Sequence, residues 1–270
     1  MQISDNVFVV TGGGSGIGRE VVLALLARGG RVAAVDRSSA GLRATTDLAT
    51  TASTDRLSTH EVDITDRAAV ALLPEAVRAA HGRVDGLVNV AGVIQPFVRF
   101  ADLDYPQMEK VIDVNLWGVI HLCKAFLPHL LARRESCLVN VSSMGALAPV
   151  PGQTMYGASK AAVKLFTEGL YAELRETTVA VTVVFPGGVD TDIAQNSGVT
   201  VPGPDAVSED PAASMTSAPE AARQILQGIE EGSYRVVIGK DAHSLDRLSR
   251  LAPKRATDLV AKKMASLLAR

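Results

Sequence analysis

The chain has 270 residues, 47% of them hydrophobic, which is enough apolar side chain for one large buried core. Its net charge of −2 gives no general reason to expect a nucleic acid or an acidic partner. The only two cysteines, Cys123 and Cys137, lie in apolar runs, so we expect buried thiols and neither a disulfide framework nor a zinc site. A signal-peptide pattern is absent and no apolar run reaches transmembrane length, which favours a cytoplasmic protein.

Short β-branched runs alternate with helical patterns along the chain. The expected strands are 6–11, 31–36, 57–63, 86–92, 136–143, 179–187 and 234–239. Amphipathic patterns between them predict helices that include 18–29, 67–82 and 159–176. Several strand runs are apolar on both faces, as a sheet covered by two helical layers requires. The alternation predicts an α/β fold with a doubly wound sheet, whose ligand lies at the carboxyl ends of the strands.

Residues 1–240 are expected to form one domain, because seven strand candidates suit a single sheet. The segment 194–219 breaks the alternation and is rich in Ser, Pro, Gly and Ala. It is either an interdomain linker or a mobile loop over a site. Too little chain follows for a second domain, so we favour a substrate loop.

Residues 241–270 are expected to form a basic amphipathic extension of two helices broken at Pro253. From Arg235 to Arg270 the sequence has nine Lys or Arg against three Asp or Glu, a local net charge of +6. Leucines and one methionine form an apolar stripe along these helices. We favour packing of the stripe on a neighbouring subunit over peripheral contact with an anionic membrane.

The sequence TGGGSGIG at 11–18 joins the first expected strand to a helix. Gly12, Gly16 and Gly18 follow a GxxxGxG spacing, which permits a tight turn and close approach of a diphosphate to the helix N-terminus. The Gly-Lys-Ser/Thr sequence of a Walker A loop is absent. This stretch therefore predicts a dinucleotide-binding turn.

Asp36 ends the second expected strand, eighteen residues after Gly18. A carboxylate at this place can accept hydrogen bonds from the adenosine ribose and repels a 2′-phosphate, which favours NAD over NADP. Arg37 is the complication, since a guanidinium there can reach a 2′-phosphate. Ser15 adds no basic group to the turn.

Further motifs follow in a fixed order. They are Asp63 in VDIT, NVAG at 89–92, Asn115 in VIDVN, Ser143 in NVSSMG, YGASK at 156–160 and PGGVDT at 186–191. With the glycine turn, this ordered set closely resembles the classical short-chain dehydrogenase/reductase family. One departure is Val90, where the family often has a second asparagine.

The resemblance implies a single Rossmann-like, three-layer domain with a seven-stranded parallel sheet and a nicotinamide cofactor. By matching position it assigns catalysis to Ser143, Tyr156, Lys160 and Asn115, and the spacing selects Ser143 over Ser142. The residues implied for cofactor binding are Gly12, Ser15, Gly16, Ile17, Gly18, Asp36, Arg37, Val62, Asp63, Asn89, Ala91, Gly92, Tyr156, Lys160, Pro186, Gly187, Val189 and Thr191. No metal site is implied.

Tyr156 and Lys160 lie four residues apart, hence on one face of a helix. The lysine ammonium is expected to lower the pKa of the phenol, so that Tyr156 serves as general acid and base while a hydride moves between an alcohol carbon and nicotinamide. Ser143 is expected to hydrogen-bond the substrate oxygen. The resemblance gives Asn115 a supporting role, holding a water that links the lysine to solvent.

Substrate recognition is expected from segments 93–100, 144–155 and 194–219, whose mostly apolar or small side chains favour a hydrophobic secondary alcohol or ketone. The preferred interpretation is an NAD-dependent oxidoreductase. Its alternatives are an NADPH-dependent carbonyl reductase of the same fold and a cofactor-binding regulator without turnover. The resemblance also implies a homodimer or homotetramer.

Overall fold

The structure is a computed structural model that describes residues 1–201 and 215–268. Its centre is a seven-stranded parallel sheet in the order β3-β2-β1-β4-β5-β6-β9. The strands are β1 (Val7–Thr11), β2 (Arg31–Asp36), β3 (Leu57–Glu61), β4 (Gly86–Asn89), β5 (Ser136–Val141), β6 (Val179–Pro186) and β9 (Arg235–Ile238). All seven expected strands are present, most of them shorter than the sequence pattern, and the predicted fold class is confirmed.

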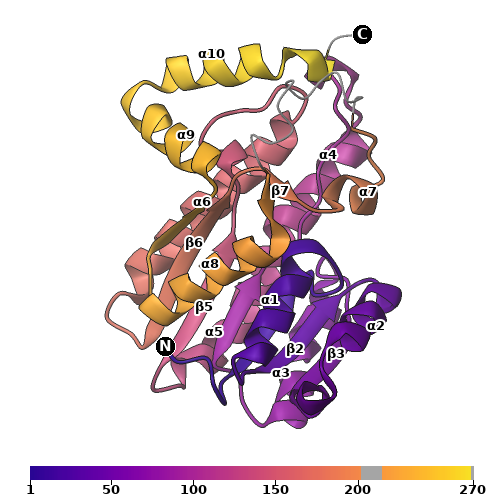
Figure 1. Cartoon of the computed structure of the whole chain (residues 1–270), viewed down its shortest axis with the longest axis vertical. Coiled ribbons are helices and arrows are strands. Elements are labelled where there is room, and N and C mark those ends of the chain that lie inside the picture. The colour runs from indigo at the N-terminus through magenta and orange to yellow at the C-terminus, as the bar shows by residue number, and fades with distance from the viewer. Residues whose placement is uncertain (202–214, 269–270) are drawn as a thin grey trace.

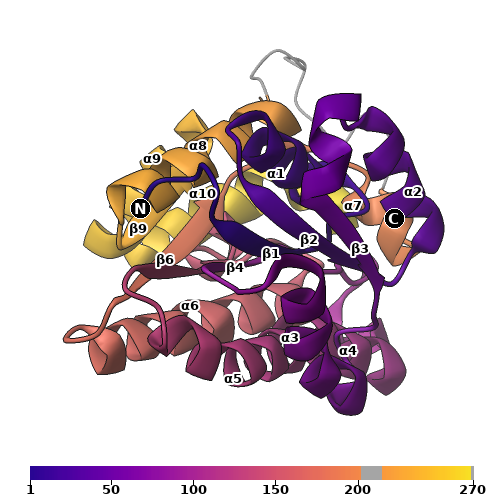
Figure 2. The ribbon, with the colours of Figure 1, turned by 90° about the horizontal axis from the view of Figure 1, so that it is seen from below.

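Two helical layers cover the sheet (Figures 1 and 2). One layer contains α1 (Gly16–Ala27), α2 (Ser39–Leu48) and α8 (Ala218–Glu231). The opposite layer contains α3 (Arg67–His81), α4 (Tyr105–Ile112), α5 (Gly118–Leu131) and α6 (Thr154–Leu174). Each layer shares a separate apolar core with one face of the sheet. Strands such as β1, buried along their whole length, are therefore apolar on both faces.

Local signals fix several helix ends. The carboxylate of Asp66 accepts hydrogen bonds from the backbone N–H groups of Ala68 and Ala69 at the start of α3. Gly82 ends that helix in the left-handed conformation at φ +81°. The structure also contains one π-helical turn at Asp113–Trp117. Short 3₁₀-helices lie at Thr51–Arg56, Phe100–Asp102, Met144–Ala146 and Ala265–Leu268.

Strand order places a crevice beside β1. This strand lies between β2 and β4. The chain runs from β1 to β2 on one side of it and from β4 to β5 on the other side. The connections that follow β1 and β4 therefore diverge at their carboxyl ends. Ligands of doubly wound folds bind at such a switch point.

The continuous helical run Tyr105–Leu131 corrects one sequence-based expectation. The run has 27 residues and contains an 18-residue window of mean hydropathy 1.3, so by length and composition alone it could cross a membrane, although we expected no such run. Its buried side chains, including Leu122, Phe126 and Leu130, pack in the core between the sheet and α3. The apolar pattern of this run is accounted for by the core of the fold.

The segment expected to be a substrate loop, 194–219, has local structure at both ends. Helix α7 (Ile193–Ser197) begins it, and the two-residue strands β7 (Val189–Asp190) and β8 (Thr216–Ser217) pair in parallel. The expected loop therefore includes short stretches of regular structure at these places. The part of this prediction that falls on residues 202–214 lies outside the described residues.

The C-terminal segment forms α9 (Lys240–Leu251) and α10 (Pro253–Lys263), with the break at Pro253. Both helices lie beyond the end of the sheet (Figure 1). Their apolar side chains Leu245, Ala256 and Val260 pack against Ala148, in the loop after β5. Part of the stripe is thus covered from within the chain, whereas both partners considered above lie outside it. Leu251 and Leu259 remain exposed.

Candidate functional site

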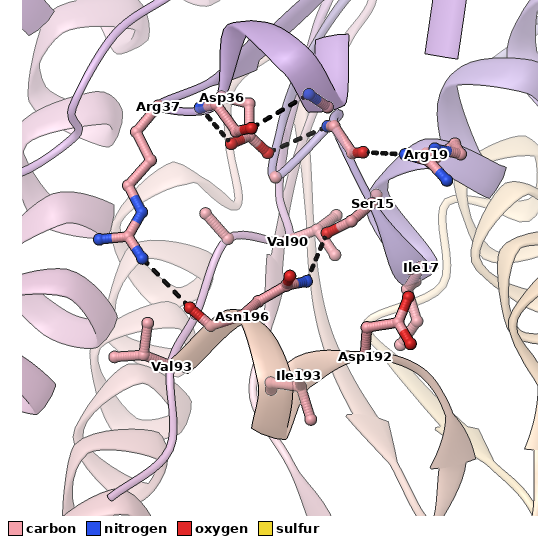
Figure 3. Close-up of a pocket in the computed structure, with 18 of the residues that line it drawn as sticks. Ser15, Ile17, Arg19, Asp36, Arg37, Val90, Val93, Asp192, Ile193 and Asn196 are labelled. Carbon is pink, nitrogen blue, oxygen red and sulfur yellow. Dashed lines mark hydrogen bonds between the residues drawn. The ribbon is translucent and has the colours of Figure 1, made fainter. Parts of the chain in front are cut away.

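A pocket of about 560 Å³ occupies the crevice at the switch point. Its walls come from the glycine turn, the end of β2, the loops after β3 and β4, and α7. Figure 3 shows the labelled side chains of Ser15, Asp36, Arg37 and Asn196 around this space. The pocket has the location at which a doubly wound sheet binds a dinucleotide.

The glycine turn packs against the start of α1 with no room for side chains. A methyl group added to Gly18 would overlap the carbonyl oxygen of Gly12 and lie 2.6 Å from its carbonyl carbon. Gly12 itself has φ +71°, a conformation that glycine adopts without strain. The turn therefore delivers the free N–H groups of α1 to the pocket, which suits a diphosphate.

Backbone N–H groups hold both carboxylate oxygens of Asp36. One carboxylate oxygen accepts a hydrogen bond from the N–H of Gly14 at 3.0 Å, and the other accepts from the N–H of Ser38 at 2.9 Å (Figure 3). Arg19 donates to the carbonyl oxygen of Gly14. The acidic group is thus held beside the turn, in the position that contacts a ribose in dinucleotide-binding folds.

Helix α7 closes the pocket on the side opposite the glycine turn. The side-chain amide of Asn196 donates to Ser15 Oγ at 3.0 Å, and the Arg37 guanidinium donates to the carbonyl oxygen of Asn196 at 3.2 Å (Figure 3). Asn196, from the expected substrate segment, therefore connects across the pocket to Ser15 and Arg37, two residues expected to bind the cofactor.

Most residues predicted to bind the cofactor line this pocket. They are Gly12, Ser15, Gly16, Ile17, Gly18, Asp36, Arg37, Val62, Asp63, Ala91, Gly92 and Thr191. The six others, Asn89, Tyr156, Lys160, Pro186, Gly187 and Val189, do not belong to its lining. Among those six, Asn89 is buried and donates to Asn140 Oδ1 at 2.8 Å, inside the core. Gly187 packs closely against the carboxylate of Asp241 in α9.

Ser143 and Tyr156 meet beside Gly145. A methyl group on Gly145 would lie 3.4 Å from Ser143 Oγ and 3.5 Å from Tyr156 Cε1. Ser143 Oγ also accepts a hydrogen bond from the N–H of Gly145 at 3.0 Å. The neighbouring Ser142 instead donates to the backbone carbonyl of Lys160 at 2.7 Å. The structure brings Ser143 to the tyrosine and uses Ser142 to hold the helix.

Lys160 and Asn115 meet at the wall of the pocket beside Gly92. A methyl group on Gly92 would lie 3.1 Å from Lys160 Nζ and 3.2 Å from Asn115 Oδ1. Lys160 is 3% exposed and donates to the carbonyl oxygen of Val141 at 3.0 Å. Asn115 lies in the π-helical turn and bonds both backbone polar groups of Val93. Such turns are frequent at functional sites.

Burial shifts the pKa of both titratable groups of this cluster. It lowers the pKa of Lys160 from 10.5 to about 8, because the ammonium loses hydration. It raises the pKa of Tyr156 above 10.0, and a hydrogen bond with Ser143 opposes the rise. The pKa of Tyr156 therefore lies above its ordinary value and not below it as we expected, because the loss of hydration raises it more than the Ser143 hydrogen bond lowers it. The phenol is protonated at neutral pH.

Comparison with known proteins decides the family. The sequence profile described as short chain dehydrogenase matches residues 6–201. This chain belongs to the short-chain dehydrogenase family. Within it, the putative oxidoreductase SadH of Mycobacterium tuberculosis is 37% identical over 261 residues, 94% of each chain. The probable oxidoreductase EphD of Mycobacterium bovis is 39% identical over 203 residues, which are 74% of this short-chain dehydrogenase but 34% of EphD.

Solved structures carry the same fold with either nucleotide. A short-chain dehydrogenase from Burkholderia phymatum in complex with NAD has a TM-score of 0.84 and 25% identity, and the match covers 95% of this chain and 97% of that one. One from Burkholderia cenocepacia in complex with NADP has a TM-score of 0.78 and 28% identity over 96% and 99%. The chain is thus an NAD(P)-dependent short-chain dehydrogenase/reductase.

Sequence reasoning missed the contribution of α7 to the pocket. Five residues are too few for a periodic pattern, and the composition around them is typical of a loop. It also missed Arg19 and Gly41, which line the pocket. The signal for Gly41 is visible only in three dimensions, because a methyl group there would lie 2.9 Å from the carbonyl oxygen of Gly14.

Proposed function

We propose that this short-chain dehydrogenase interconverts a secondary alcohol and a ketone with NAD, and that Tyr156 is its general acid and base. The proposal rests on two contacts beside the dinucleotide pocket. Tyr156 lies with Ser143 at Gly145, and Lys160 lies with Asn115 at Gly92. Such groups at the end of a cofactor groove match the need of hydride transfer for proton transfer at the substrate oxygen.

In the direction of reduction, bound NADH supplies the hydride. Tyr156 gives its hydroxyl proton to the oxygen of the ketone, and Ser143 donates a hydrogen bond to the same oxygen as negative charge develops. Lys160 has a pKa of about 8, so at pH 7 it is largely an ammonium that stabilises the phenolate left behind. In the direction of oxidation, Tyr156 takes the alcohol proton.

Replacement of Tyr156 by Phe tests the acid–base role. Tyr156→Phe should lower kcat by at least about 100-fold, within the usual contribution of general acid–base catalysis, and leave the Kd for NADH within about twofold. Tyr105→Phe is the matched control, because Tyr105 is 77% exposed on α4. Undiminished turnover in Tyr156→Phe refutes the mechanism. NADH binding without turnover of any tested substrate by the unaltered protein supports the regulator instead.

The preference for NAD is proposed from the carboxylate of Asp36, held at the glycine turn by the N–H of Gly14. The alternative, NADPH, draws on the exposed guanidinium of Arg37 at the same rim. Titration calorimetry with NADH and NADPH separates the two, with Asp36→Ala and Arg37→Ala as variants. Tighter NADPH binding to the unaltered protein refutes the preference, and Asp36→Ala should narrow the difference between the nucleotides.

A fairly hydrophobic substrate is proposed from the loop after Ser143. Met144 and Val150 in this loop are partly buried against α9 and α10. Oxidation of secondary alcohols should therefore improve as their alkyl or ring portion grows. A panel of steroids, acyl chains, sugars and small diols, followed by NADH absorbance, checks this, and a preference for sugars contradicts it.

We further propose a cytoplasmic homodimer or homotetramer. The cysteines are free thiols, as a reducing compartment requires. Several large side chains, among them Tyr105, Trp117 and Leu165, are exposed on the helical layer that includes α4 and α6. Light scattering should report a mass of at least two chains. Liposome sedimentation with and without residues 241–270 tests the less favoured membrane contact.

A further inference from the structure

The loop after β4 connects three parts of the site through consecutive residues. Val93 exchanges backbone hydrogen bonds with the side chain of Asn115. The N–H of Ile94 donates to Ser197 Oγ in α7, at 3.0 Å. Gln95, the next residue, points into the interior and is 1% exposed. The sequence placed this segment among the substrate contacts, and the structure instead buries the polar side chain of Gln95.

Every polar atom of the Gln95 side chain is directed at the start of α6. Its Oε1 accepts hydrogen bonds from the N–H of Met155 at 2.7 Å and from the N–H of Tyr156 at 3.1 Å. Its Nε2 donates to the carbonyl oxygen of Gly152 at 2.9 Å. The backbone carbonyl of Gln95 accepts from Gln153 Nε2 at 2.6 Å. One buried amide therefore spans the turn that leads into the helix.

Helix α6 needs this contact because its own N-cap residue does not supply it. The first N–H groups of any helix lack intrahelical partners, and a side chain at the N-cap position usually satisfies them. Here the N-cap residue is Gln153, and its side chain makes no capping hydrogen bond. Gln95 takes that role from a loop about 60 residues earlier in the sequence.

The capped N–H groups include that of Tyr156 itself. Its side chain lies one helical turn from Lys160 on the face turned toward Ser143 and Gly92. A shift of the first turn of α6 moves the phenol relative to Ser143, whereas Lys160, whose carbonyl is held by Ser142, stays in place. The reaction requires a proton donor held to within a fraction of an ångström.

We propose that Gln95 is a positioning residue for the reaction, which fixes the first turn of α6 and thereby the hydroxyl group of Tyr156. This inference rests on the proposed function of Tyr156. It adds a residue that contacts neither substrate nor cofactor and acts through the backbone of the tyrosine. It also makes the loop after β4 a physical connection between the closing helix α7, the π-helical turn and the proton donor.

The experiment compares three variants of the full chain. Gln95→Met keeps an unbranched side chain of similar length and removes the capping oxygen. Gln95→Glu keeps an oxygen acceptor at the helix N-terminus, where negative charge is favourable, and loses the donor to Gly152. Thr167→Val is the matched control, because Thr167 is buried on the same helix and its hydroxyl accepts from Asn140 at 3.0 Å, away from the site.

Hydrogen exchange at Met155 and Tyr156 measures the cap, and steady-state kinetics on the best ketone of the substrate panel measure its consequence. We expect Gln95→Met to speed exchange at both amides by at least about tenfold and to lower kcat by about 10- to 100-fold, with little change in the KM for NADH. Gln95→Glu should recover much of both, and Thr167→Val should change neither.

Two results overturn the inference. One is unchanged exchange at Met155 and Tyr156 in Gln95→Met. The other is a kcat of this variant within twofold of the unaltered enzyme, or no lower than that of Thr167→Val. The exchange measurement needs no substrate, so it stands apart from the proposed function. That function fails separately, if turnover by the unaltered enzyme does not depend on Tyr156.

Discussion

Substitution of Gly18 by alanine tests whether close backbone contact builds the dinucleotide site. The added methyl would overlap the carbonyl oxygen of Gly12, lie 2.6 Å from its carbonyl carbon and lie 3.2 Å from the nitrogen of Gly13. All three atoms belong to the backbone, so no side chain can rotate away. We therefore expect the glycine turn to move away from α1 and its N–H groups to lose their arrangement around the diphosphate.

The magnitude follows from the contact distances. Carbon atoms pack best at about 3.5–4.0 Å, so the turn must open by about 1 Å. Overpacking of this kind costs about 1–3 kcal/mol, and a contact with rigid backbone belongs at the upper end. The higher helix propensity of alanine offsets up to about 1 kcal/mol of this loss of stability. The net loss is about 2 kcal/mol, or a fall in Tm of about 4–8 °C.

Thermal unfolding with and without NADH, together with titration calorimetry, checks this prediction. We expect the affinity of Gly18→Ala for NADH to fall by at least about tenfold, which is about 1.4 kcal/mol. Gly169→Ala is the matched control. Gly169 is exposed in α6, and a methyl group there meets no atom within 4 Å among the described residues. It should raise the Tm slightly and leave NADH binding unchanged.

Two outcomes would contradict the reasoning. If Gly18→Ala bound NADH as tightly as the unaltered protein, close approach at this turn would not be required for the cofactor. If Gly18→Ala and Gly169→Ala shifted the Tm equally, the change would report helix propensity and not the contact with Gly12.

Three further predictions concern titratable groups. The side chains of His60 and His81 both hydrogen-bond Ser58, and burial lowers the pKa of each imidazole below 6.5. The urea concentration at the unfolding midpoint should therefore fall as the pH drops from 6.5 to 5. In a His60→Gln/His81→Gln variant this midpoint should depend less on pH. Burial raises the pKa of Cys123 and Cys137 to about 12, so iodoacetamide should modify neither thiol until the protein is unfolded in urea. Since burial also raises the pKa of Tyr156, kcat/KM for alcohol oxidation should rise from pH 7 to 9, measured by NADH absorbance.

Each of these has a clear opposite result. An unchanged slope in the double histidine variant would place the acid sensitivity elsewhere in the protein. Alkylation of the folded protein would mean that the core opens readily around one of the thiols. A pH-independent rate of oxidation would show that proton removal by Tyr156 does not limit kcat/KM.

The sign of the histidine effect follows from the difference between the folded and unfolded states. Both imidazole rings have a lower pKa in the folded protein than in the unfolded chain. At a pH between the folded and the unfolded pKa, the unfolded chain therefore binds more protons. Stability therefore rises with pH through this range and is complete above about 6.5. A nearby Arg31 and the charge of His60 itself disfavour a proton on His81.

Residue types and spacing predicted the sheet, and the residues predicted to bind the cofactor make up about half of those that line the pocket. Strand runs such as 31–36 are apolar on both faces because two helical layers cover them, and this local pattern does not depend on distant contacts. The glycine turn was recognisable for the same reason, since strand, turn and helix are adjacent in sequence. Asp36 follows directly from the end of its strand.

Long-range contacts decided what the sequence left open or predicted wrongly. Gln95 caps a helix some 60 residues away, and nothing in its neighbourhood in the sequence marks it as buried. Helix α7 is too short to show a period, and the partner of the C-terminal stripe is a loop about 100 residues earlier. The pKa of Tyr156 moved opposite to expectation, because the sequence shows a neighbouring lysine but not the loss of water.

The sequence by itself determined the order of strands and helices and the glycine turn, because these depend on local backbone preferences and short spacings. Only the tertiary structure decided how the site is closed and held. Helix α7 over the pocket, the Gln95 cap on α6 and the surroundings of the Tyr156 hydroxyl group are built from segments far apart along the chain. Burial and hydrogen bonding between such segments depend on packing, which no local pattern records.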